Sequence, residues 1–209
     1  MSERLRYPEL APEGIAAMRG LEHYLNATTA LPAVLLELVR LRVSLLNGCE
    51  FCIGHHRKEL QKHNEPQSRT DALADWAASD AFTQRERHAL AWADAITNIQ
   101  DGHAAAPEYD SVSEFFHGKD LVDLTLAIAS INSWNRMSIA FKAEWDPASG
   151  KNPGAAAPDK VLSPGGTPPP STAPPATGTV SSPAETTPAH EDAPTADVVD
   201  DDGGKVAHD

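Results

Sequence analysis

Residues 48–56 have the sequence GCEFCIGHH and contain both cysteines of the 209-residue chain. If a helix begins at the start of this stretch, each residue advances about 100° around the helix axis. Cys49, Cys52 and His56 then share one narrow face, whereas His55 lies outside it. The spacing therefore makes His56 the expected partner of the cysteine pair.

A Cys-x-x-Cys pair at the start of a helix has a specific chemical consequence. The first-turn N–H groups have no acceptor within the helix, and the helix dipole places partial positive charge there. Both effects favour the thiolate and lower the pKa of a cysteine. A histidine one turn later can accept the thiol proton and stabilise the charge that results. We therefore interpret Cys49, Cys52 and His56 as a redox thiol site.

Three other uses of the cysteine pair have to be weighed. The simplest alternative is that both cysteines are buried and purely structural, but their spacing and the histidine that follows make this role less expected. A structural zinc site would need a second Cys/His pair with ligand spacing, and the part of the chain expected to fold has none. A c-type haem would need histidine directly after Cys52, where Ile53 stands. The sequence thus predicts neither a metal nor a cofactor.

Charge and hydropathy restrict the partners and the location. The formal net charge of −13 argues against nucleic acid and against anionic membrane surfaces. No apolar run reaches the roughly 18–20 residues of a membrane-spanning helix, and residues 1–6 lack the apolar core of a secretory signal. We therefore expect a cytoplasmic protein with reducible thiols.

The composition changes near residue 146. Residues 147–209 have no aromatic side chain but 12 of the 17 prolines, and their nine acidic residues outnumber three lysines. Such a segment cannot bury enough apolar surface to offset the entropy lost on ordering. We predict a helical domain over residues 1–146 and a disordered Pro/Ala/Thr-rich acidic tail over residues 147–209, by default a solvated spacer.

The first 146 residues show helical periodicity and no strand-like alternation, so the predicted class is all-α, with about six to seven helices. Thr83 and Glu86 have the spacing of a capping box, and Gly118 is expected to end a helix. The final segment is apolar on most sides, which is typical of a helix at the centre of a domain or an assembly. The expected helices cover residues 12–26, 32–46, 49–64, 70–79, 83–99, 107–117 and 119–145.

Glu37 lies within an otherwise apolar helix, twelve residues before Cys49. It could be solvated or paired with Arg40 or Arg42, which is the more frequent situation. A buried glutamate facing the cysteine helix would instead be a general base or part of a proton relay.

Asn132, Asn135 and Arg136 form a polar cluster in the apolar last helix. Buried polar side chains most often satisfy backbone groups or cap a neighbouring helix. We expect that role in preference to direct catalysis.

Glu37, eleven intervening residues and then Cys49-x-x-Cys52-x-x-x-His56 resemble the active-site signature of the alkylhydroperoxidase D-like, carboxymuconolactone decarboxylase family. The flanking segments are similar to its single-domain, peroxidase-like branch, and the resemblance covers about residues 8–145. These flanks are LVRLRVSLLNG at residues 38–48, RER at 85–87 and INSWNR at 131–136.

The resemblance implies an all-helical domain that forms a homo-oligomer, commonly a trimer or a hexamer. It also implies reduction of a hydroperoxide substrate at the expense of a dithiol, either a reductant protein or a small molecule. In this family's pattern Cys52 is the reactive thiol, Cys49 the resolving thiol, and Glu37 and His56 the proton relay. One departure is Phe51, which stands where alkylhydroperoxidase D has a second histidine. Decarboxylases of the family lack the redox pair, so decarboxylation is not expected here.

Two alternatives to peroxidase activity stay open. A dithiol–disulfide oxidoreductase could recycle another peroxidase while having little peroxidase activity itself. A helical oligomeric binding protein with vestigial cysteines would have thiols that titrate near the ordinary value of about 8.5 and form no internal disulfide.

Overall fold

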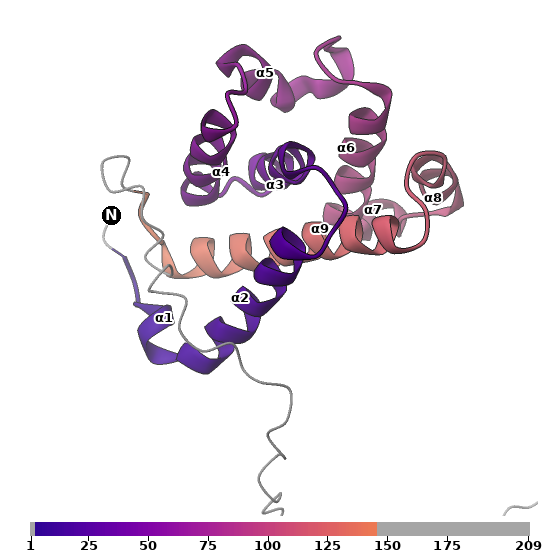
Figure 1. Cartoon of the computed structure of the whole chain (residues 1–209). Coiled ribbons are helices and arrows are strands. Elements are labelled where there is room, and N and C mark those ends of the chain that lie inside the picture. The colour runs from indigo at the N-terminus through magenta and orange to yellow at the C-terminus, as the bar shows by residue number, and fades with distance from the viewer. Residues whose placement is uncertain (1–2, 146–209) are drawn as a thin grey trace, which may run out of the picture. The chain divides into compact units, whose positions relative to one another are not determined.

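A computed structural model describes residues 3–145, which contain helices and no strand (Figure 1). The all-α prediction is confirmed, and seven of the α-helices within these residues have six residues or more. The predicted tail, residues 147–209, lies outside the described residues. The elements are α1 Tyr7–Leu10, α2 Pro12–Ala27, α3 Ala33–Asn47, α4 Glu50–Lys62, α5 Gln67–Ala72, the 3-10 helix η1 Leu73–Ala78, α6 Gln84–Thr97, α7 Ile99–Gly102, α8 Ala106–Ser113 and α9 Lys119–Phe141.

Helix α3 is the central element of this domain. Figure 1 shows it nearly end-on, with α4, α6 and α9 around it, and it contacts all three. Its sequence is apolar on most sides, so Leu38, Val39 and Leu41 are completely buried. The last helix, expected at the centre of the domain or of an assembly, is α9, and it packs against α2, α3, α4 and α6. Its apolar residues extend beyond the faces that these helices cover, so Val122 and Ile139 are exposed.

A sharp turn joins α3 to α4 and places the first cysteine. Gly48 has a left-handed φ of +66°, which a residue without Cβ adopts readily. The N–H of Cys49 then donates to the carbonyl of Ser44 at 3.0 Å, so the last turn of α3 is closed. Cys49 is extended and serves as the N-cap of α4, which begins at Glu50. The predicted helix start is therefore confirmed to within two residues.

Several predicted boundaries were wrong in detail around α5. The short helix expected over residues 70–79 begins earlier, at Gln67 after Pro66, and continues as the 3-10 helix η1 from Leu73. Asp75 has non-helical dihedrals, so the segment turns, and Ala77 is exposed instead of buried. The capping box of Thr83 and Glu86 is present as predicted.

The second half of the domain also differs from the expected helix ends. Helix α8 stops at Ser113, and Gly118 with φ +50° precedes α9 instead of ending α8. Helix α6 ends at Thr97, so Ile99 lies in the separate short helix α7 and is exposed. Helix α9 ends at Phe141, where Lys142 adopts a left-handed conformation. Turn geometry, which periodicity does not specify, sets each of these ends.

Trp145 lies against the face of α4 that carries Phe51, Gly54 and His55. Its ring centroid is 5.7 Å from that of Phe51 and 6.1 Å from that of His55. A Cβ atom on Gly54 would come within 2.5 Å of the indole Nε1. Gly54 therefore allows the indole to approach the helix backbone. The segment after α9 thus packs against α4, the helix that begins at the cysteine pair.

We predict that Gly54→Ala lowers the free energy of unfolding, measured with urea, by about 1–3 kcal/mol because the indole must move. An alanine in an unobstructed helix interior would instead raise it by up to about 1 kcal/mol. In a Trp145→Ala background the same change should therefore become stabilising. Equal effects of Gly54→Ala in both backgrounds would contradict the close packing of the indole against α4.

Candidate active site

Glu37 of α3 and His56 of α4 form a buried pair. Their side chains meet with His56 Nδ1 2.8 Å from Glu37 Oε2, and the two residues are only 6–8% exposed. The other carboxylate oxygen of Glu37 accepts a hydrogen bond from Arg40 Nη1 at 2.6 Å. Glu37 is therefore paired with an arginine and also faces the cysteine helix, so the two alternatives given for it in the sequence analysis are both met.

The ionisation of Glu37 is set by competing effects. Burial by itself raises the pKa of this carboxyl group, but the charge of His56 and hydrogen bonds from His56 and Arg40 outweigh it, and the pKa falls to about 2. Glu37 is thus a carboxylate at neutral pH and can only accept hydrogen bonds. It follows that Nδ1 of His56 carries the proton and donates it, which leaves Nε2 as the basic ring nitrogen.

Arg40 is itself held in place from two helices. It is 4% exposed, and its Nη2 donates to Glu22 Oε2 at 2.8 Å and to Asn26 Oδ1 at 3.1 Å, both in α2. Ser130 of α9 donates in turn to the second oxygen of Glu22. Sequence reasoning did not find Glu22 and Asn26, because their helix has no spacing relation to the cysteine motif.

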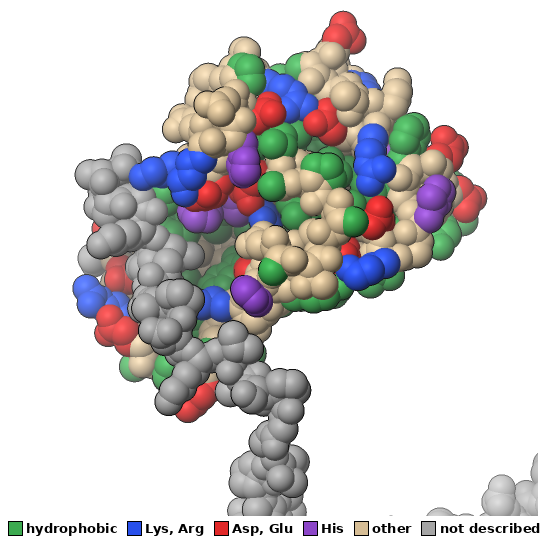
Figure 2. All heavy atoms as spheres, viewed as in Figure 1, with side chains coloured by type: hydrophobic (Ala, Val, Ile, Leu, Met, Phe, Trp, Pro, Cys, Tyr) green, Lys and Arg blue, Asp and Glu red, His purple; other side chains and the backbone are tan. Residues whose placement is uncertain are grey.

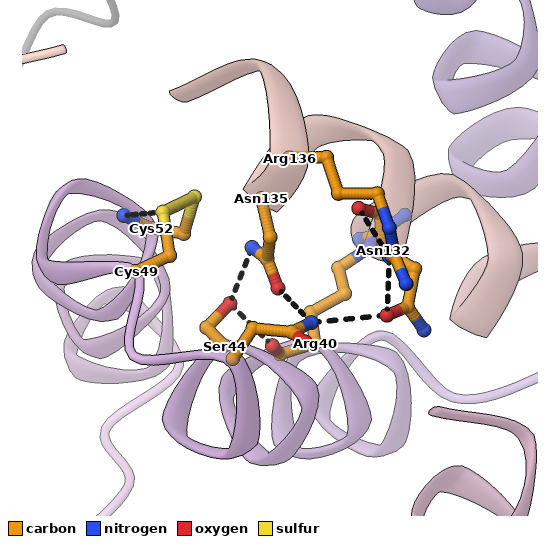
Figure 3. Close-up of a disulfide and its surroundings, with 8 residues drawn as sticks. Arg40, Ser44, Cys49, Cys52, Asn132, Asn135 and Arg136 are labelled. Atoms are coloured by element: carbon orange, nitrogen blue, oxygen red, sulfur yellow. Dashed lines mark hydrogen bonds between the residues drawn. A yellow bond between two sulfur atoms is a disulfide. The ribbon is translucent and has the colours of Figure 1, made fainter. Parts of the chain in front are cut away.

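Cys49 and Cys52 are joined by a disulfide within the chain (Figure 3). Their Cα atoms are 5.3 Å apart, and the residues are 2–3% exposed. The N–H of Cys52 donates to Cys49 Sγ at 3.3 Å, so the free N–H groups of the helix start act mainly on Cys49. His56 follows Cys52 by one turn on the same face. The two cysteines thus differ in the group that can stabilise each thiolate.

Asparagines of α9 hold the end of α3 that leads to Cys49. The Asn47 amide donates to Asn132 Oδ1 at 3.0 Å and to Asn135 Oδ1 at 2.9 Å, while Asn135 donates to Ser44 Oγ at 3.2 Å. Figure 3 shows both asparagines extending from α9 toward α3, with Asn135 between Asn132 and the disulfide in this view. These bonds connect helices and fix the turn.

Arg136, the third member of the polar cluster, is bonded within its own helix. Its Nη1 donates to the backbone carbonyl of Asn132 at 3.0 Å and to the side-chain oxygen of that residue at 2.9 Å. Asn132 in turn donates to Thr97 Oγ1 at 3.0 Å. Each member thus satisfies polar groups in the packed structure, as expected.

His55 lies off the shared face of Cys52 and His56, as the helical spacing predicts. Its ring packs edge-on against His56 with centroids 5.0 Å apart, and its Nδ1 is buried without a hydrogen bond. Burial, followed by the charge of His56, lowers the pKa of His55 to about 4. His55 is consequently neutral at pH 7.

Within residues 3–145 there is no group of three or more His, Cys, Asp or Glu side chains that could hold a metal ion. Over the same residues, no helix combines the length and the hydropathy that a membrane crossing requires.

The all-helical domain has a buried Cys-x-x-Cys pair at the start of α4 and a buried Glu–His pair that joins α3 to α4. Residues 12–95 match the carboxymuconolactone decarboxylase family. YdfG, an uncharacterized protein of Bacillus subtilis strain 168, is 38% identical over 146 residues, which are 68% of this chain and 95% of YdfG. The chain therefore belongs to the carboxymuconolactone decarboxylase family.

Solved structures show the same fold. One is a protein of unknown function from Agrobacterium tumefaciens, provisionally described as an AhpD antioxidant defence protein. It is 30% identical with a TM-score of 0.67, and the alignment covers 69% of this chain and 99% of that one. The debrominase Bmp8 has a TM-score of 0.60 at 21% identity, with 68% and 77% of the two chains covered. At that identity the similarity to Bmp8 concerns the fold alone.

The lowered pKa of His55 leads to a prediction on stability. An unfolded His55 titrates near 6.5, so between about pH 4 and 6.5 the unfolded state binds more protons than the folded state. The free energy of unfolding should therefore fall as the pH is lowered from 7 to 5, with about 2 kcal/mol of the fall due to His55. Glu37 adds nothing in this range, because its contribution is lost only below about pH 4.5.

Urea unfolding of His55→Gln and of the wild type at pH 7 and pH 5 measures this difference. His23→Gln is the matched control, since His23 is exposed. The slope with pH should flatten in His55→Gln only. An unchanged slope in that variant would contradict the neutral, buried state of His55.

Proposed function

We propose that the protein is a thiol-dependent peroxidase that reduces hydroperoxides with Cys52 as the reactive thiol and Cys49 as the resolving thiol. The observation that carries the proposal is the buried 2.8 Å contact between Glu37 and His56, on the helical face that Cys52 shares. A carboxylate that orients a histidine is the arrangement by which enzymes activate a nucleophile. Family membership and the antioxidant description of the Agrobacterium relative agree with this reaction.

The first step oxidises Cys52. The Nε2 atom of His56 accepts the thiol proton, and the carboxylate of Glu37 stabilises the imidazolium that forms. The thiolate attacks one peroxide oxygen, the O–O bond breaks, and Cys52 becomes a sulfenic acid. The leaving alkoxide takes the proton back from His56 and departs as an alcohol. The hydroperoxide is thereby reduced by two electrons, all of which come from Cys52.

The second step closes the disulfide, and a third step opens it. The sulfur of Cys49 attacks the sulfenic sulfur of Cys52, and the hydroxyl leaves as water with the Cys49 proton. A dithiol then reduces the disulfide by two exchange reactions and is itself oxidised to a disulfide. The same proposal includes a dithiol reductant and a homo-oligomeric assembly, a trimer or a hexamer, both of which rest on the family resemblance. It also includes a cytoplasmic location, which rests on the composition.

The peroxidase proposal predicts that peroxide consumption with a small dithiol requires Cys52, Glu37 and His56. Glu37→Gln and His56→Gln should each lower the turnover rate by about 10²–10⁴ because general-base assistance is lost. Their combined effect should be smaller than the product of the two, since both act on one proton transfer. Hydroperoxides of increasing size and several reductants form the assay set.

His55→Gln is the matched control at pH 7.5, because it removes an adjacent histidine outside the shared face. Cys52→Ser should abolish turnover. Cys49→Ser should consume at most one peroxide per protein molecule, because the sulfenic acid of Cys52 then has no resolving thiol. Disulfide exchange without peroxide consumption in the wild type would contradict the proposal and favour the oxidoreductase that recycles another peroxidase. Full activity of Cys52→Ser would contradict any role of the pair.

A further inference from the structure

A cavity of about 230 Å³ reaches the Glu37–His56 pair from the side of Glu37. Glu37 and Arg40 of α3 line it, together with Glu59 and His63 of α4. Its lining residues do not include Cys49, Cys52 or His56. One water molecule has a share of about 30 Å³ in the liquid, so the cavity has room for several. It thus offers the carboxylate of Glu37 a connection to solvent that does not pass the sulfur atoms.

Titratable side chains follow one face of α4 from the disulfide to this cavity. Cys52, His56, Glu59 and His63 are separated by four, three and four residues, and such intervals place side chains above one another on a helix. His56 is buried, Glu59 half-buried and His63 exposed at the C-cap. Figure 2 shows histidine and acidic side chains gathered over α4. The row therefore runs from the protein interior to the surface.

The charges of the cavity fit water better than an anion. Arg40 is already bonded to two carboxylates, those of Glu22 and Glu37. Glu59 adds a further negative charge, which Lys62 approaches from the exposed side at 2.5 Å. The Nε atom of Arg40 is buried and makes no hydrogen bond with the described residues.

The reductive step of the proposed cycle requires such a route. Exchange begins with a thiolate of the reductant, whose own proton has gone to solvent. The sulfur that leaves the Cys49–Cys52 disulfide departs as a thiolate and must gain a proton inside the site. Two such exchanges return both cysteines to thiols, with two electrons from the dithiol and two protons from solvent. A docked reductant covers the sulfur side at that moment, so those protons need another entrance.

We propose that this water-sized cavity is the proton port of the Glu37–His56 pair and that Glu59 and His63 exchange protons with solvent at its mouth. The proposal rests on the proposed function only in taking this pair as the relay of Cys52. Water in the cavity connects the carboxylate of Glu37 with the surface groups. Glu59 and His63 are positioning residues for this transfer and have no contact with the peroxide.

The test measures how fast the Nδ1 proton of His56 exchanges with solvent, by NMR of the full chain. The resonance is identified by its loss in His56→Gln. Ala33, an exposed lining residue one turn before Glu37, is changed to leucine to fill the cavity. Ala33→Leu should slow the exchange about tenfold or more, because the proton then needs a local opening of the fold. Ala27→Leu, an exposed position outside the lining, should leave the rate unchanged.

A second set of variants tests the role of Glu59 and His63 at the mouth of the cavity. Glu59→Gln and His63→Gln together should slow the exchange, and added imidazole should restore it because a small proton carrier replaces the lost groups. His23→Gln is the control for an exposed histidine away from the cavity. No effect of the double variant would overturn the role of Glu59 and His63, while an unchanged rate in Ala33→Leu would overturn the port itself.

This test involves neither peroxide nor a thiol, so its outcome is separable from that of the peroxidase assay. Slowed exchange in Ala33→Leu with an inactive wild type would leave the port in place and remove the proposed function. Normal peroxide turnover by the wild type, with an unchanged exchange rate in Ala33→Leu, would support the proposed function and overturn the port. The same slowing in Ala27→Leu as in Ala33→Leu would also overturn the port, because the effect would then not depend on the cavity.

Discussion

The carboxylate of Glu37 is the group on which the site depends. It is buried in the central helix, where an unpaired charge would be strongly unfavourable. Arg40 and His56 supply the compensating hydrogen bonds, and Glu22 fixes Arg40 from another helix. A single charged residue in α3 thereby connects α2, α3 and α4. Removing one partner would leave a buried charge without compensation, so the pair constrains the fold as well as the chemistry.

The position of the cysteines follows from the same central helix. Gly48 ends α3 in a left-handed turn, and the α9 asparagines hold the last residue of α3. The first cysteine therefore lies at the start of α4 with its sulfur near a free N–H group, whereas the second lies one turn from the histidine. Local backbone geometry acts on Cys49, and a tertiary contact with α3 sets up the histidine available to Cys52. This division explains how two cysteines three residues apart could have different roles.

Local spacing was enough to predict the helical class, the one-turn separation of Cys52 and His56 on the cysteine helix, and the capping box at Thr83. The sequence could not show that Glu37 binds Arg40 and His56 together, because that contact depends on how α3 packs against α4. Glu22 and the cavity beside Glu37 could not be found either, since they come from α2 and from the space between helices.

The central claim is that Glu37 acts through His56 on the thiol of Cys52. Its most direct measurement is the alkylation rate of Cys52 against pH in a Cys49→Ser background, with and without Glu37→Gln. The account predicts a midpoint below the ordinary cysteine value of about 8.5 with Glu37 present, and an upward shift when Glu37 is replaced. An identical midpoint in both proteins would contradict the account, because Glu37 would then be only the ion-pair partner of Arg40.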